Sequence, residues 1–75
     1  MVETKNLTTP EKLTLIRRLQ RIKVNDVLDA VGETRQNMHV KFTRGNMKES
    51  DIRKYAEALG CKVDIVFTMP DGKKI

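Results

Sequence analysis

The stretch from Thr34 to Lys48 carries the side chains best suited to binding chemistry. It opens with three hydrogen-bonding residues, Arg35, Gln36 and Asn37, and holds the chain's only histidine, His39. Arginine matches guanine O6 and N7, and glutamine matches adenine N6 and N7, each through two hydrogen bonds. The segment contains no acidic residue. Its basic residues are Arg35, Lys41, Arg44 and Lys48. The segment therefore favours recognition of duplex DNA, in which the nearby lysine and arginine side chains neutralise phosphates.

Catalytic and metal chemistry find no comparable group of residues. Cys61 is the only cysteine, so the sequence offers neither an internal disulfide nor a zinc site built on several thiolates. No second imidazole accompanies His39, which we expect to be exposed or close to a phosphate. No nucleophile is paired with a base. We therefore expect a protein that is not an enzyme, holds no metal and needs no cofactor.

Composition points the same way. The 75 residues carry a net charge of +5 and a sequence pI near 9.7, which favours a polyanionic partner. Aromatic residues make up only 4%, which disfavours single-strand binders that stack bases on exposed rings. No apolar run approaches the ~20 residues of a membrane span, and the N-terminus lacks the pattern of a signal peptide. A cytoplasmic location is expected.

The first half of the chain predicts two helices. The first covers about 10–22, with Thr9 as its cap and Pro10 in its first turn. Its apolar stripe consists of Leu15, Ile16, Leu19 and Ile22, and Leu13 lies off that stripe. The second helix covers about 25–31, with Asn25 as a possible cap and Gly32 just past its end. Its stripe consists of Val24, Val27, Leu28 and Val31.

Two further helices are predicted in the second half. Thr34 caps a helix over about 35–43, in which Met38 and Phe42, four residues apart, face the core together. Ser50 is expected to cap a fourth helix that ends at Gly60. The apolar side chains of that fourth helix are Ile52, Tyr55, Ala56 and Leu59.

After Gly60 the apolar period changes from that of a helix to that of a strand. Apolar and mostly polar residues alternate over 61–69, which predicts a strand with one apolar face. Residues 73–75 are too short to supply much of a return strand, and a lone strand leaves its backbone groups unpaired. Pairing within the chain or with a second chain is therefore open, and we favour a dimer. Its interface residues are expected to be Val63, Ile65, Phe67 and Met69.

The chain thus divides into a flexible N-terminus over 1–8, a helical DNA-binding domain over 9–60 and a C-terminal strand and tail over 61–75. The helical domain resembles the phage repressor/Cro-like helix-turn-helix regulators, the XRE family. The resemblance rests on the run from Val24 to Met38 and on the later run from Ala56 to Gly60, and it covers about residues 10–60. In the first run, the matching positions are Val27, Val31, Gly32, Thr34 and Met38.

The resemblance implies a mainly α fold of four helices and a sequence-specific regulator of transcription, such as a repressor, in a bacterial or phage-infected cytoplasm. It places the helix over 35–43 in the major groove and has the protein bind as a homodimer on two half-sites. The implied base-contacting residues are Arg35, Gln36, His39 and Val40. The implied phosphate-contacting residues are Asn25, Thr34, Asn37, Lys41, Arg44, Asn46 and Lys48.

Two alternatives stay open. In the first, the strand over 61–69 adds to the sheet of a different protein, as in an antitoxin, and DNA binding is secondary. In the second, the basic face binds RNA, although the low aromatic content disfavours it.

Overall fold

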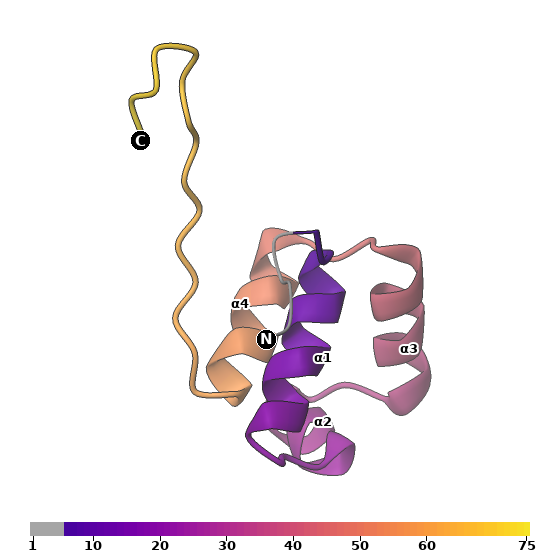
Figure 1. Ribbon diagram of the computed structural model, residues 1–75. Coiled ribbons are helices and arrows are strands. Elements are labelled where there is room, and N and C mark those ends of the chain that lie inside the picture. The colour runs from indigo at the N-terminus through magenta and orange to yellow at the C-terminus, as the bar shows by residue number, and fades with distance from the viewer. Residues whose placement is uncertain (1–5) are drawn as a thin grey trace.

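A computed structural model describes residues 6–75 of the chain, and these form four helices followed by an extended C-terminal arm (Figure 1). The mainly helical fold predicted from the sequence is confirmed. The expectation of a flexible N-terminus over 1–8 falls mostly on residues 1–5, which lie outside the described residues. The helices are α1 (Thr9–Leu19), α2 (Val24–Val31), α3 (Arg35–Arg44) and α4 (Glu49–Ala58).

Helix α1 begins and ends earlier than its sequence pattern predicts. Thr8, rather than Thr9, is the cap: its hydroxyl accepts from the Glu11 N–H, and the Glu11 carboxylate accepts from the Thr8 N–H at 3.2 Å. The helix stops at Leu19 because Arg21 adopts a left-handed backbone with φ of 57°. The predicted extension to residue 22 is therefore wrong.

The remaining helix starts are confirmed at one position and corrected at two. Thr34 caps α3, its hydroxyl accepting from the Asn37 N–H at 3.1 Å. Asn25 does not cap α2, because the helix already begins at Val24. Ser50 does not cap α4, which begins one residue before it and is preceded by Lys48, whose N–H donates to the Asp51 carboxylate.

The core lies between the four helices and corrects the predicted stripe of α1. Leu13, placed off that stripe from the sequence, is only 6% exposed, whereas Leu19 is 73% exposed. With α1 ending at Leu19, Ile22 reaches the core from the following turn instead of from the helix. The fully buried cluster consists of Leu13, Val27, Tyr55, Ala56 and Leu59.

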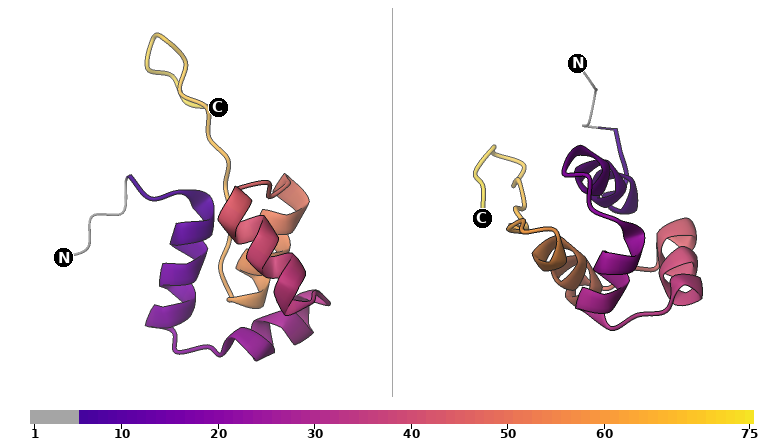
Figure 2. Two further views of the ribbon diagram at one scale, coloured as in Figure 1. Left: turned by 90° about the vertical axis from the view of Figure 1, so that its right-hand side faces the viewer. Right: turned by 90° about the horizontal axis from the view of Figure 1, so that it is seen from below.

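The helices pack so that α1 contacts both α3 and α4, and α2 contacts both α3 and α4. Figure 2 shows α3 on one flank of the helical body and the C-terminal arm leaving from the end of α4. None of the helices within residues 6–75 combines the length and apolar character needed to cross a bilayer.

The arm does not form the regular strand predicted over 61–69. Within the described residues, the only β pairing is an isolated antiparallel bridge between Thr68 and Lys74. Phe67 and Ile75 exchange two backbone hydrogen bonds of 2.9 Å, and the Met69 N–H donates to the Lys73 carbonyl at 2.7 Å. The segment 73–75 thus folds back after all, but it covers only the far end of the arm, and residues 61–66 have no partner strand.

Candidate nucleic-acid interface

Helix α3 is anchored by two apolar side chains on its inner face. Met38 and Phe42 both pack against the buried cluster, as their four-residue spacing predicts. The Phe42 ring meets the Tyr55 ring edge to face, with centroids 5.1 Å apart and an interplanar angle of 80°. No residue of α3 is fully buried, so the helix lies on the surface of the bundle.

The outer face of α3 carries four exposed side chains that share one side of the helix. They follow the spacing i, i+3, i+4 and i+7, which places them in a row along two turns. None of the four packs in the core. They are Gln36, His39, Val40 and Thr43.

Thr43 is a member of this row that sequence reasoning missed. Its Oγ1 lies 3.5 Å from Nε2 of His39, one turn earlier. The i+7 spacing from Gln36 is the signal that would have identified it. The row offers an amide, an imidazole, a hydroxyl and the methyl groups of Val40, which is the mixture that base edges and thymine methyls recognise in a major groove.

Arg35, at the start of α3, is held against the start of α2. Its Nη2 donates to Oδ1 of Asn25 at 2.8 Å, and both side chains are exposed. The contact joins a predicted base-contacting residue to a predicted phosphate-contacting residue. A guanidinium carries five N–H donors, so this bond leaves Arg35 with donors to spare.

Lys41 lies in an internal ion-pair network instead of on the free surface. Its Nζ is 2.8 Å from Oε2 of Glu33 and 3.0 Å from Oδ1 of Asp51, which ties α3 to the α2–α3 turn and to α4. Hydrogen bonds from Lys41 lower the pKa of both carboxyl groups, and the carboxylates raise the pKa of the ammonium group. This network makes Lys41 the predicted phosphate contact with the least freedom to reach DNA.

Two other predicted phosphate contacts also have partners inside the chain. The Asn37 amide donates to Oε1 of Glu33 at 3.0 Å, and the Thr34 hydroxyl serves as the cap of α3. Arg44, Asn46 and Lys48 follow the outer row of α3 and are all exposed. Among the described residues, the side chains of Arg44 and Asn46 make no hydrogen bond or ion pair, so both are available to a ligand.

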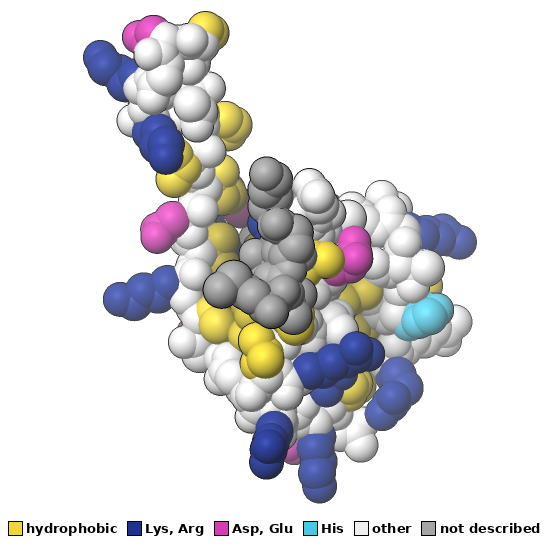
Figure 3. All heavy atoms as spheres, in the orientation of Figure 1, with side chains coloured by type: hydrophobic (Ala, Val, Ile, Leu, Met, Phe, Trp, Pro, Cys, Tyr) yellow, Lys and Arg dark blue, Asp and Glu magenta, His cyan; other side chains and the backbone are white. Residues whose placement is uncertain are grey.

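A second basic group lies at the end of α1. Arg18, Arg21 and Lys23 are exposed, whereas Nη1 of Arg17 donates to the Ile22 carbonyl at 2.9 Å and secures the turn after the helix. Figure 3 shows Lys and Arg side chains gathered on the lower part of this face, below the single histidine on α3. Positive charge therefore borders the outer row of α3.

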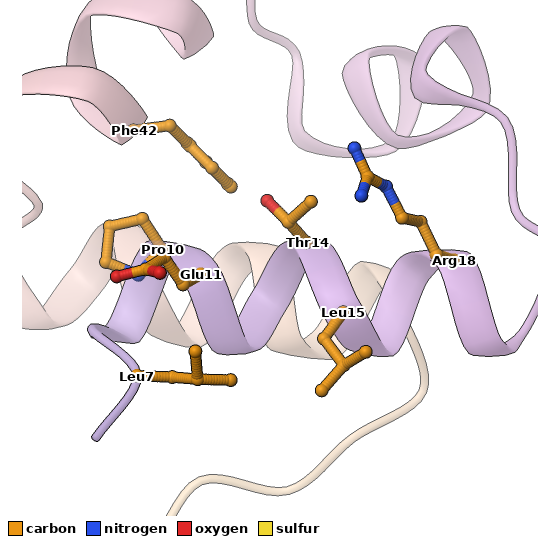
Figure 4. Close-up of a pocket in the computed structure, with 7 residues that line it drawn as sticks. All are labelled: Leu7, Pro10, Glu11, Thr14, Leu15, Arg18 and Phe42. Atoms are coloured by element: carbon orange, nitrogen blue, oxygen red, sulfur yellow. The ribbon is translucent and has the colours of Figure 1, made fainter. Parts of the chain in front are cut away.

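A shallow apolar hollow of about 330 Å³ separates α1 from Phe42 of α3 (Figure 4). Leu7 is half-buried on its wall. Only Glu11 and Arg18 bring charge to it, and its residues include no cysteine or histidine. No three His, Cys, Asp or Glu side chains within residues 6–75 are grouped to hold a metal ion. The hollow is lined by Leu7, Pro10, Glu11, Thr14, Leu15, Arg18 and Phe42.

Comparison of the chain with family models, with curated proteins and with solved structures finds no match.

Proposed function

We propose that this chain is a sequence-specific regulator of transcription that binds double-stranded DNA with α3 in the major groove, as a homodimer on two half-sites. The observation that carries the proposal is that α3 has one face packed in the core and an opposite face that is exposed. Met38 and Phe42 attach the helix to the core, whereas Gln36, His39, Val40 and Thr43 form an exposed row with no packing role.

The order of the elements supports the same function. Gly32, with φ of 71°, ends α2 and turns the chain into Thr34, the cap of α3. This helix–turn–helix arrangement, together with the sequence resemblance to the repressor/Cro-like family, favours α3 as the recognition helix. In this proposal the row on α3 meets base edges, and Arg35 contacts a base at the N-terminal end of the helix.

Phosphate contacts follow from exposure and charge. Arg44 is the last residue of α3, and Asn46 and Lys48 follow it, so that all three reach the DNA backbone while the row occupies the groove. Asn25, Thr34 and Asn37 contribute from the other end of α3. Lys41 acts mainly by fixing α3 to α4, because two carboxylates already neutralise it.

Selection of bound sequences from random DNA duplexes tests the proposal. We expect a palindromic consensus, because a two-fold dimer presents the same helix to both half-sites. Affinity should fall steeply with added salt as displaced counterions return to the phosphates. A chain that ignores duplex DNA at low salt, or that prefers RNA in direct competition, contradicts the proposal.

Three variants then separate base contacts from phosphate contacts. Gln36→Ala should weaken the selected site by roughly 1–3 kcal/mol and relax preference at one base pair. Arg44→Ala should weaken all sequences alike and reduce the slope of the salt dependence by about 1. Lys54→Ala is the matched control, since Lys54 is an exposed basic residue on α4 and takes no part in the proposed interface. If Gln36→Ala behaves like this control, the row on α3 does not contact bases.

A further inference from the structure

The C-terminal arm exposes more apolar surface than any other part of the described chain. Ile65 is 45% exposed, Val66 55%, Phe67 71%, Met69 41% and Ile75 73%. The arm also projects away from the helical body (Figure 1). A cluster of exposed apolar side chains on a small chain indicates an interaction site, because covering it releases water at a gain in free energy.

The arm also has one free backbone edge. Four of its five odd-numbered residues have a backbone partner on the other edge, Ile65 being the exception: the Cys61 N–H donates to Ala56, the Val63 carbonyl accepts from Arg53, and Phe67 and Met69 pair with the returning segment 73–75. Along its even-numbered residues no backbone group bonds to any described residue. Those residues are Lys62, Asp64, Val66 and Thr68. An open edge of this kind is a template for another strand.

We propose that the occupant of this edge is a second copy of the chain, which pairs antiparallel through residues 61–69 about a two-fold axis at Ile65. In this register Ile65 faces its own counterpart, Val63 faces Phe67 of the second copy, and Cys61 faces Met69. All five apolar side chains of the odd-numbered face then find an apolar partner directly opposite. The two arms with their returning segments make a four-stranded antiparallel sheet.

The sequence of the arm selects this register over its neighbours. A shift that places odd-numbered residues opposite even-numbered ones would set apolar side chains against polar ones. An axis at Asp64 would oppose two carboxylates directly, which is destabilising. An axis at Val63 would leave Phe67 and Met69 without partners, and an axis at Val66 would bring Pro70, which has no N–H, into the ladder.

The chosen register also covers apolar surface reciprocally. Val63 packs against the core of its own domain. Its partner in the register is Phe67 of the second copy. The Phe67 ring of each arm therefore lies beside Val63, at the edge of the other subunit's core. The inference deepens the proposed function, since binding to two half-sites rests on a two-fold dimer, and it specifies which edge and which residues make that dimer.

Cysteine trapping in the full-length chain, without DNA, tests both the edge and the register. In a Cys61→Ser background, Ile65→Cys should form a disulfide dimer on mild oxidation, because paired residues on a two-fold axis bring their β-carbons within disulfide reach. Val63→Cys and Phe67→Cys are matched controls: neither should cross-link alone, and the two should cross-link when mixed. Cross-linking at Asp64→Cys or Val66→Cys instead would overturn the register.

Sedimentation of the unmodified chain tests the dimer independently. Val66→Pro removes a donor from the free edge and should weaken dimerisation at least tenfold while the helical circular dichroism is retained. A chain that stays monomeric at its highest soluble concentration overturns the inference and favours a different protein on the arm. If such a monomer still binds a single duplex half-site, recognition of duplex DNA by α3 survives and only the homodimer part of the proposed function fails. A trapped dimer that ignores duplex DNA would contradict DNA binding and leave the dimer intact.

Discussion

The ring of Phe42 meets the buried ring of Tyr55 edge to face, at a centroid separation of 5.1 Å. This contact joins α3, which has no fully buried residue, to α4. Tyr55 and Ala56 of α4, together with Leu59 at its C-cap, make up three of the five residues of the buried cluster. Because α3 packs through few side chains, its orientation depends strongly on this pair. The stability of the fold and the presentation of the outer row are therefore coupled through Phe42.

Replacement of Phe42 by alanine is expected to destabilise the chain by about 2–3 kcal/mol, somewhat below the usual cost for a fully buried phenylalanine, because Phe42 is half-buried. Leu19→Ala is the control, since Leu19 is 73% exposed and should change the free energy of unfolding by no more than about 0.5 kcal/mol. Urea denaturation followed by circular dichroism measures both. Equal effects from the two variants would show that α3 is not anchored as described.

Tyr55→Phe is expected to stabilise the chain by roughly 1 kcal/mol. The Tyr55 side chain is buried, and its hydroxyl has no hydrogen-bond partner among the described residues. Burial also raises the pKa of this phenol, so the group stays neutral at physiological pH. Removal of the hydroxyl keeps the ring contact with Phe42 while it eliminates an unpaired polar group. A marked loss of stability in thermal unfolding would reveal a partner for the hydroxyl.

Acid should weaken the fold through the network around Lys41. Lys41 lowers the pKa of Glu33 and of Asp51 below their ordinary values of 4.5 and 3.8. Carboxyl groups whose pKa is lower in the folded state stabilise it at pH values above the unfolded pKa, and this contribution disappears as pH falls through the folded pKa. We therefore expect thermal stability to decline below about pH 4.5.

Lys41→Met tests that origin. The variant should be less stable than the parent at neutral pH, where two carboxylates lose their cation, and the difference should narrow as both become protonated. Glu49→Gln removes the anion of the exposed pair with Arg53, leaves the Arg53 hydrogen bond to the Val63 carbonyl in place, and serves as the control, because such surface pairs contribute little. Melting temperatures of the three proteins across the acid range decide the matter: a parent–variant difference that is constant with pH would exclude this network as the cause.

Gly32→Ala should cost roughly 1 kcal/mol, and Gly32→Asn less, because Asn tolerates the left-handed backbone better than Ala. Gly32 has φ of 71°, and a β-carbon built there meets nothing within 4 Å. The cost therefore arises from backbone conformation and not from a clash. Chemical denaturation of both variants checks the order, and an alanine variant as stable as the parent would show that the turn relaxes freely.

Most of the helical fold followed from short-range signals. The apolar spacing in 24–31 and in 52–59, the glycine at position 32 and the cap at Thr34 all depend on neighbours within a few residues, and the structure confirms them. Most errors in the helices lie at their ends, but the buried stripe of α1 left out Leu13, and the regular strand predicted over 61–69 does not form among the described residues. At the start of α1, Pro10 favours Thr9 as the cap, whereas the spacing of Thr8 from Glu11 matches a capping box, and the reciprocal bonds between Thr8 and Glu11 decide for Thr8.

The candidate site divides in the same way. The exposed row on α3 is largely visible from its spacing, although Thr43 was overlooked, and its DNA contacts stay a prediction. The ion pair between Lys41 and Asp51 could not be predicted from the sequence, because Asp51 lies ten residues away and approaches Lys41 only after α4 packs. Likewise, the left-handed Arg21 that shortens α1 carries no glycine or proline signal.

By itself, the sequence determined the number and order of the helices, the basic segment around α3 and the alternating arm. These features depend on local periodicity and charge, which the chain carries in any conformation. Only the tertiary structure decided that Leu13 and not Leu19 is buried, that Lys41 is held by Glu33 and Asp51, and that segment 73–75 pairs with 67–69. Each of these outcomes depends on which surfaces meet once the elements pack, and that is a property of the assembled bundle.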